Sequence, residues 1–180
     1  MANGKFLEKN YAIYLRLVSD GTTGKQWNNR LENQGKILSL EVQDLLKSPK
    51  FEMTKGQNFN LVILKKTLTK ALALTKDELL AEAFSLHLLP VNLELACLLR
   101  EELTLYWLDR LNLQKVIIPG KPSLAIFGDG HFRTIDDAPN FLREGCFGYV
   151  FRQPQSHEYS QNGWSWEQVE RVQLETKNHS

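Results

Sequence analysis

A Gly-x-x-Gly-Lys pattern from Gly21 to Lys25 is the stretch of this chain whose residue types best suit binding of a phosphate group. Backbone N–H groups at a helix N-terminus attract anions, and a neighbouring lysine can reach the outer phosphates. A complete phosphate-binding loop also needs a glycine where this chain has Ser19, and a serine or threonine where it has Gln26. The pattern therefore fits a capped strand-to-helix turn as well. The candidate anion-binding residues are Thr23, Gly24 and Lys25.

Cys146 and His131 are the residues from which a nucleophilic site could be built. A cysteine attacks as a thiolate, and a histidine within hydrogen-bond reach can take up its proton. Asp136 or Asp137 would then orient the imidazole. The competing interpretation is a packed strand, because an unpaired cysteine is commonly a small buried hydrophobe.

Asp129 and His131 form a second acid–base pair, within the sequence Gly128-Asp129-Gly130-His131. Asp-Gly is also the dipeptide that a tight hairpin turn prefers, so the turn alone explains Asp129. A metal site would need a second histidine or a cysteine pair at ligand spacing, which this sequence lacks. We predict neither a metal nor another cofactor.

Lysines are frequent between residues 47 and 76. Within this segment Lys65, Lys66 and Lys70 are the candidate nucleic-acid-binding residues. Cations can contact phosphates while nearby aromatic residues, here Phe51 and Phe59, stack on bases. The same lysines would also protect an exposed strand edge against aggregation.

Trp164 and Trp166 are the candidate protein-interface residues. Residues separated by two positions lie on different sides of a helix, so both rings cannot pack in the same apolar stripe. One of the two rings should therefore remain available to a partner. Docking of the tail on the chain's own core is the competing interpretation.

Hydrophobic patterns and turn residues predict the elements that must position these side chains. Strands are expected at residues 11–18, 59–64, 116–118, 124–127, 131–135 and 146–152, with a loop at 50–58. Capping residues predict where helices begin. The first helix is capped by Thr22 or Thr23 and ends at about Gln34, and the second runs from Ser39 to Lys47. The third begins at Thr75, which forms a capping box with Glu78, and the fourth begins after Asn92. The last is capped by Thr104 and ends at about Leu111, followed by Asn112 in a left-handed conformation.

Helices thus concentrate in the first two-thirds of the chain and strands in the last third, which favours an α+β fold. We expect a helical N-terminal two-thirds packed on a mostly antiparallel sheet built largely from the C-terminal third, plus a C-terminal helix. The expected parts are a single domain at 1–153, a polar loop or linker at 154–163, a helix at 164–176 and a frayed tail at 177–180. The alternative is a helical half joined to a small β half near residues 113–122.

Composition narrows the class of protein. The chain has 180 residues, of which 42% are hydrophobic and 24% charged, as in globular domains. Its 22 basic and 21 acidic residues give a net charge of +1, which excludes a protein that binds through a global positive field. We expect a cytoplasmic protein that does not enter membranes, because residues 1–10 lack an apolar signal region and no apolar run reaches about 20 residues.

Several segments resemble small uncharacterised proteins of candidate-phylum bacteria. They are Ser19 to Trp27, Arg30 to Glu32, residues 46–51 and residues 95–101, within about the first three-quarters of the chain. The resemblance implies a bacterial, cytoplasmic, stand-alone domain and no site residue, since that family has no assigned activity. The Trp-rich C-terminal segment lies outside the shared pattern.

Because no catalytic or metal pattern is complete, we expect a non-enzymatic binding or regulatory protein that recognises a protein or nucleic-acid partner. One alternative is a small hydrolase or transferase that uses Cys146 and His131. Another is a nucleotide-binding regulator that uses the turn from Gly21 to Lys25. A homodimer would suit exposed strand edges and Trp166.

Overall fold

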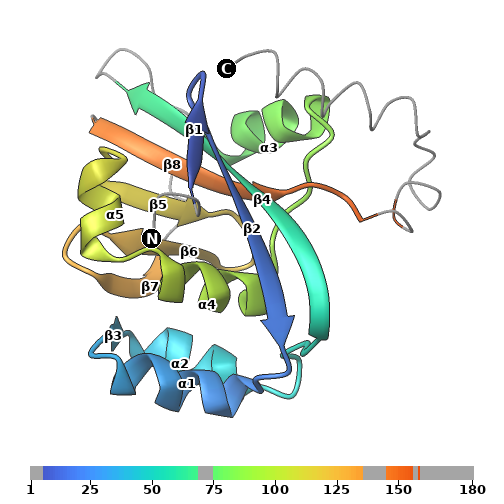
Figure 1. Ribbon diagram of the computed structural model, residues 1–180, viewed down its shortest axis with the longest axis vertical. Helices are drawn as coiled ribbons and strands as arrows, with labels where there is room; N and C mark the ends of the chain where they lie inside the picture. The colour runs from blue at the N-terminus through green and yellow to red at the C-terminus, as the bar shows by residue number, and fades with distance from the viewer. Residues whose placement is uncertain (1–5, 69–74, 136–144, 156–157, 159–180) are drawn as a thin grey trace.

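Eight strands form one mixed sheet in the computed structural model, which describes residues 6–68, 75–135, 145–155 and 158 (Figure 1). β5 pairs in parallel with β8, as does β3 with β7, whereas the other neighbours are antiparallel. Across the sheet, the strands are β1 (Leu7–Lys9), β2 (Ala12–Asp20), β4 (Lys55–Leu68), β8 (Gly145–Arg152), β5 (Lys115–Ile118), β6 (Ser123–Phe127), β7 (His131–Ile135) and β3 (Ile37–Leu38).

The prediction that this sheet is built largely from the C-terminal third is wrong. β1, β2, β3 and β4 all precede residue 69 and supply half of its strands. The expected loop at 50–58 is partly strand, since β4 begins at Lys55 and runs for 14 residues. Its polar residues, such as Gln57 and Asn58, have low strand propensity, but Asn58 pairs with Val18 of β2 and the Gln57 N–H donates to Ser19 Oγ at 3.1 Å. Contacts with β2 therefore override local propensity here, since β8 pairs with β4 only from Leu61 onward.

The helices begin where their capping residues predict. α1 (Gly24–Asn33), α2 (Leu40–Lys47), α3 (Lys76–Ser85), α4 (Leu93–Glu102) and α5 (Leu105–Arg110) each follow a side chain that accepts a hydrogen bond from the N–H three residues on. This bond satisfies one of the donors that the first helical turn leaves unpaired. The confirmed caps are Thr23, Ser39, Thr75, Asn92 and Thr104. Asn112 is left-handed at φ 55°, as expected.

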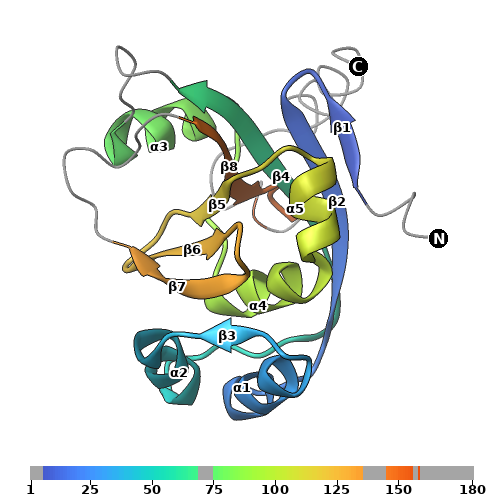
Figure 2. The same ribbon diagram turned by 90° about the vertical axis from the view of Figure 1, so that its left-hand side faces the viewer.

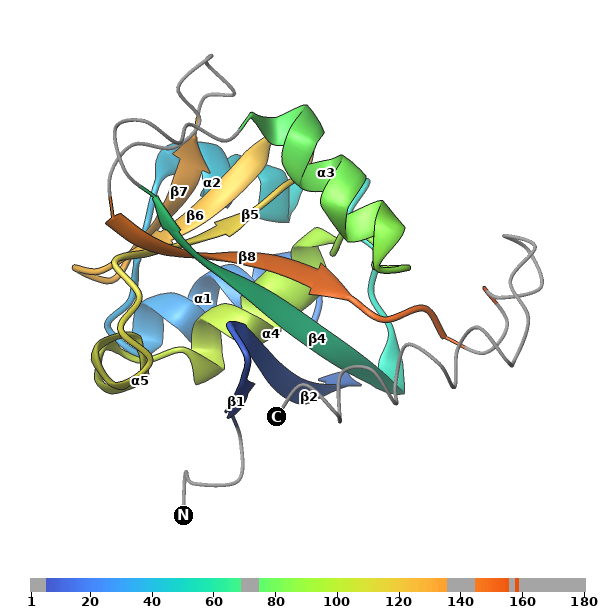
Figure 3. The same cartoon turned by 90° about the horizontal axis from the view of Figure 1, so that it is seen from above.

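The sheet separates two helical layers (Figures 2 and 3). The larger core lies on the side of α1, α2, α4 and α5, and contains the buried side chains of Trp27, Leu46 and Leu99. The smaller core lies under α3, where Leu79 and Ala83 pack on strand residues of the opposite face. The described residues thus form one α+β domain around a shared sheet.

The C-terminal predictions fall almost entirely on residues outside the described part of the chain. The helix at 164–176, the tail at 177–180, Trp164 and Trp166 lie outside the described residues, as does most of the expected linker at 154–163. Within the part of the chain that the structure does describe, no helix is long and apolar enough to cross a membrane.

Candidate functional site

The turn before α1 uses its hydrogen-bond donors within the chain. The Thr23 N–H donates to Gln26 Oε1 at 2.9 Å, and the Gln26 N–H donates to Thr23 Oγ1 at 3.2 Å. The Thr22 N–H donates to Asp20 Oδ1 at 3.1 Å. Side-chain oxygens of this chain therefore accept the hydrogen bonds that the Thr22, Thr23 and Gln26 N–H groups could otherwise donate to a bound phosphate.

Gly24 has a packing role at the same turn. A Cβ added to it would lie 1.9 Å from the carbonyl oxygen of Leu46, so only a glycine lets α1 and α2 approach this closely. Thr23, Gly24 and Lys25 also line one wall of a groove of about 510 Å³, which has Lys47 on its other side. The structure thus brings the predicted anion-binding residues together and adds a second lysine to them.

Arg30 of α1 joins three elements in a polar cluster. Its Nε donates to Glu101 Oε2 of α4 at 2.6 Å, and its Nη1 donates to Asp20 Oδ2 of β2 at 2.6 Å. The guanidinium also lies 4.4 Å from the centre of the Trp27 ring, within the range of a cation–π contact. Gln34 Nε2 donates to Glu101 Oε2 at 2.7 Å. This cluster fixes the C-terminal end of β2 against α1 and α4.

The ionised forms of the cluster stabilise one another. Burial raises the pKa of Asp20, but the hydrogen bonds from Arg30 and Thr22 outweigh it and hold that pKa below its usual value. The hydrogen bond to Glu101 raises the pKa of Arg30 above its usual value, against the opposing effect of burial. Both groups therefore stay charged at neutral pH.

The end of β2 beside this cluster has an open edge. β1 pairs only with Ala12 to Tyr14, and no other described strand pairs with the outer side of β2 (Figure 1). We refer to residues 15–20 as the open edge of β2. The side chains of Arg16 and Val18 are exposed there, Val18 by 51%.

A groove of about 270 Å³ runs along this open edge. β2 lines it from Leu15 to Val18 and at Asp20, α1 contributes Arg30, and α4 contributes Leu98, Glu101 and Glu102. Leu15, Leu17 and Leu98 are buried and make its apolar part. We call this feature the edge groove. Its walls combine unpaired strand backbone, apolar side chains and charged groups, the three components that bind extended peptides.

The structure places the proposed cysteine site on separated strands. β5 and β6 lie between β8, which carries Cys146, and β7, which carries His131. Three strand spacings amount to about 14 Å, far beyond hydrogen-bond reach. Cys146 is partly exposed, and its Sγ lies 3.8 Å from Thr67 Oγ1. The structure does not bring the nucleophile and its predicted base together. Asp136 and Asp137 lie outside the described residues.

His131 does lie beside Asp129 at the tip of the β6–β7 hairpin. The Asp129 carboxylate accepts a hydrogen bond from the His131 N–H at 3.0 Å, and its Oδ2 lies 3.0 Å from His131 Nδ1. These contacts hold the pKa of Asp129 below its usual value. The His131 side chain is exposed by 44% and that of Asp129 by 66%, so water reaches both groups of the pair. Among the described residues, no three His, Cys, Asp or Glu side chains are grouped to hold a metal ion.

Lys65 and Lys66 do not share a surface. Adjacent residues of a strand point to opposite faces of the sheet. Lys65 Nζ donates to Glu8 of β1 at 2.8 Å, whereas Lys66 Nζ forms an ion pair with Glu82 of α3. Each positive charge thus has a carboxylate partner from a neighbouring element. Lys70 lies outside the described residues.

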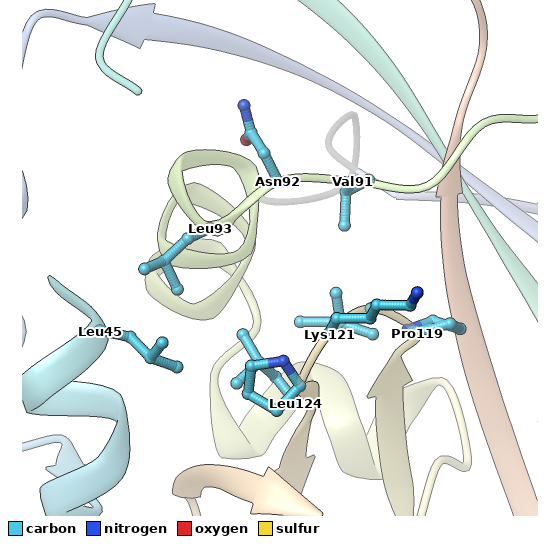
Figure 4. Close-up of a pocket in the computed structure, with 10 residues that line it drawn as sticks. Leu45, Val91, Asn92, Leu93, Pro119, Lys121 and Leu124 are labelled. Atoms are coloured by element: carbon cyan, nitrogen blue, oxygen red, sulfur yellow. The ribbon is translucent and has the colours of Figure 1, made fainter. Parts of the chain in front are cut away.

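A further pocket of about 240 Å³ lies between α2, α4 and the β5–β6 turn. Figure 4 shows Leu45 and Leu93 on one side of it and Leu124 and Pro119 on the other, with Lys121 near Pro119. Its lining holds no carboxylate, histidine or cysteine, and Lys121 is the one ionisable side chain among its lining residues.

The sequence reasoning missed the cluster that shapes the edge groove. Arg30 and Glu101 lie 71 positions apart, and each occupies an ordinary polar position of an amphipathic helix. One sequence signal could have pointed to this cluster. Asp20 lies just before the cap of α1, and an acidic residue there can face a basic residue two turns along the helix, here Arg30.

Comparison with known proteins does not assign the chain to a family. No family model matches it, and neither a curated protein nor a solved structure shows significant similarity to it. The resemblance to proteins of candidate-phylum bacteria therefore stays a prediction, and the functional conclusion rests on the geometry of the chain itself.

Proposed function

We propose that this chain is a non-enzymatic binding protein, and that it recognises a partner protein by adding an extended segment of that partner to the open edge of β2. The observation that carries this proposal is the coincidence of an unpaired strand edge and a groove along it. Main-chain hydrogen bonds to the edge supply affinity in this mode of recognition, and pockets for alternate side chains supply specificity.

The hydrogen-bonding phase of β2 supports the proposal. The Lys65 N–H donates to the Tyr11 carbonyl oxygen at 2.7 Å, so odd-numbered residues of β2 direct their backbone groups towards β4. Backbone groups alternate in direction along an antiparallel ladder. Those of Arg16 and Val18 therefore point to the open edge, where each offers one donor and one acceptor to an added strand.

The alternative functions find less support in the described residues. A nucleic-acid groove would need unpaired cations on one surface, whereas Lys65 and Lys66 form ion pairs on opposite faces. The hydrolase or transferase would need Cys146 beside His131, and two strands lie between theirs. The nucleotide-binding version would need free donors before α1, where Thr23 already pairs with Gln26.

Selection from a library of random twelve-residue peptides tests the proposal, with Val18→Pro as the blocked variant. Proline removes the Val18 N–H, which faces the open edge, and leaves the ladder to β4 intact. Val18→Thr retains this N–H and is the matched control. Peptides selected on the wild-type chain should bind Val18→Thr equally well and Val18→Pro about tenfold more weakly, a loss of about 1.4 kcal/mol.

Two outcomes would contradict the proposal. Selected peptides that bind Val18→Pro as tightly as the wild type would place recognition elsewhere on the surface, and failure to select any peptide would remove peptide recognition. Equal melting temperatures of the two variants would show that the blocked edge, rather than unfolding, causes the loss. Retention of RNA by the wild type that is lost in the double variant Lys65→Gln and Lys66→Gln would favour a nucleic-acid partner.

A further inference from the structure

The pocket between α2, α4 and the β5–β6 turn has the composition of a site for a small molecule. Its walls are made mainly of aliphatic side chains and prolines, which are Leu45, Val91, Leu93, Ile118, Pro119, Pro122 and Leu124. Sites for small ligands are concave and mostly apolar, with a few polar groups that fix the orientation of the ligand. We refer to this pocket as the turn pocket (Figure 4).

The volume of the turn pocket limits the size of its ligand. The pocket offers about 240 Å³. A cavity of about 150 Å³ holds benzene, and sites for drug-sized ligands begin at about 300 Å³. One ring, or one branched chain, that carries a short polar group therefore fits.

Hydrogen bonds within the chain fix the walls of the turn pocket. The Gly120 N–H donates to Ser123 Oγ at 3.2 Å, and Lys76 Nζ donates to the Gly120 carbonyl oxygen at 2.5 Å. On the opposite wall, Asn92 Oδ1 accepts the Leu95 N–H at 3.0 Å and so caps α4. The pocket therefore does not depend on a ligand to keep its shape, and little ordering of the chain would oppose binding.

Lys121 gives the turn pocket a positive charge. It is the one ionisable residue of the lining, and Figure 4 shows its side chain near Pro119, across the pocket from Leu45. The Lys121 side chain is exposed and forms no ion pair with any residue that the structure describes. Glu94, in the first turn of α4, is buried, and its carboxylate accepts hydrogen bonds from Thr54 at 2.7 and 2.6 Å. That carboxylate is thus bound outside the pocket and does not line it.

We propose that the turn pocket binds a small organic acid, with its apolar body among Leu45, Leu93 and Leu124 and its carboxylate beside Lys121. The lysine ammonium is a compact point charge, so one carboxylate balances it. A cationic ligand would meet a like charge there, and a neutral ligand would gain nothing from the ammonium. The site is separate from the proposed binding of a partner, because its lining shares no residue with the edge groove.

Three probes that share a phenyl ring on a short chain test this assignment. They are phenylacetate, its neutral amide phenylacetamide, and the cationic phenethylamine. Chemical shifts of the backbone amides of the isotope-labelled chain report both the affinity and the place of binding. The acid should bind with a dissociation constant below about 1 mM and about fivefold more tightly than the amide, and the amine should bind most weakly. Its shifts should concentrate at the amides of Leu93, Gly120 and Leu124.

Two variants separate the effect of the charge from that of the apolar body. Lys121→Gln should weaken binding of the acid about fivefold and leave the amide unchanged, because only the acid uses the ammonium. Leu45→Trp adds a ring within the pocket and should weaken the acid and the amide alike. Leu40→Trp is its matched control, on the same helix at a position that is 74% exposed and outside the lining. Lys9→Gln is the control for the charge, since β1 lies four strands away from β5.

Contrary results overturn the assignment in distinct ways. Equal binding of the acid and the amide, or equal binding of the acid to Lys121→Gln and Lys9→Gln, would show that the ammonium takes no part and would overturn the choice of an acid. Shifts concentrated along the open edge of β2, or no saturable shift with any probe, would overturn the turn pocket as the site. If Leu45→Trp does not fold, the two exposed lysine variants decide. Val18→Pro should bind phenylacetate as the wild type does, so that failure of this site leaves the proposed function standing.

Discussion

α2 packs so closely against α1 at Gly24 that its backbone would overlap a Cβ atom at this position. The Leu46 carbonyl oxygen would be 1.9 Å from that atom, and the contact is with backbone, which cannot rotate away. Gly24→Ala should therefore lower the free energy of unfolding by about 2–3 kcal/mol through overpacking. Urea denaturation measures this change.

Gly35→Ala is the matched control for that substitution. Gly35 has φ +78° and no atom within 4 Å of an added Cβ, so alanine there costs only backbone strain, about 1 kcal/mol. Equal losses for the two variants would contradict the packing role. A phosphate-binding role for Gly24 predicts instead that Gly24→Ala changes anion affinity with little loss of stability.

Asp20 makes the folding stability of the chain depend on pH. Its pKa is lower in the folded chain than the usual 3.8, because the hydrogen bonds from Arg30 and Thr22 outweigh the effect of burial. The folded state therefore binds a proton less readily than the unfolded state. The stabilisation is complete above pH 3.8 and is lost as the pH falls through the lower, folded pKa.

Urea denaturation of the wild type and Asp20→Asn between pH 7 and pH 2.5 tests this dependence. The stability difference between them should be largest at pH 7 and should shrink as the pH falls below 3.8. In the Arg30→Met background the effect of Asp20→Asn at pH 7 should be smaller, because the main partner of the carboxylate is gone. A difference that grows on acidification would contradict the argument.

At the scale of the elements, local signals carried most of what could be predicted. Each helix begins after a capping residue whose side chain binds the N–H three positions further along. The signal that predicts a helix start therefore lies within about one helical turn of sequence. The C-terminal strands likewise alternate with tight turns. Residues 57 and 58 of β4 lack such a signal, since residues of β2 more than 35 positions away in the sequence hold them extended.

The candidate site was less predictable than the elements that build it. Thr23, Gly24 and Lys25 do share a groove, because they are neighbours in the chain. The edge groove joins Leu17 to Leu98 and Arg30 to Glu101 through the packing of α4 on β2 and α1. That packing depends on the order of the strands, and a single sequence does not encode strand order in any local pattern.

Strand order also separates residues that motif reasoning would combine. His131 and Cys146 are 15 positions apart, and both lie on strands of the same sheet. The parallel pairing of β5 with β8 inserts two strands between them. Residue types alone therefore suggested a catalytic pair that the topology keeps apart.

For the whole molecule, Arg100 links the helical layer to the far hairpin of the sheet. It is 3% exposed, and its guanidinium donates to the Leu103 carbonyl oxygen at 2.9 Å and to the Gly130 carbonyl oxygen at 2.7 Å. Burial lowers the pKa of Arg100 below its usual value. One side chain thus satisfies the backbone at the end of α4 and at the β6–β7 turn, whose positions in the sequence are far apart.

Arg100→Met should leave two buried carbonyl groups without this donor and lower the free energy of unfolding by about 2–3 kcal/mol, after allowance for the desolvated charge that it removes. Arg100→Lys should recover part of this loss, since an ammonium retains the charge but lacks the two-pronged geometry. Arg110→Met, at an exposed position of α5, is the control and should change stability by less than about 0.5 kcal/mol.

Hydrogen exchange distinguishes a lost link from a general loss of stability. In Arg100→Met the β6–β7 hairpin, including the Gly130 N–H that donates to Phe127 at 2.8 Å, should exchange earlier than the amides shared by β2 and β4. If protection falls equally in both regions, Arg100 stabilises the core as a whole and does not tie the hairpin to α4. If neither region changes, the two carbonyl groups find other donors and the link has no energetic role.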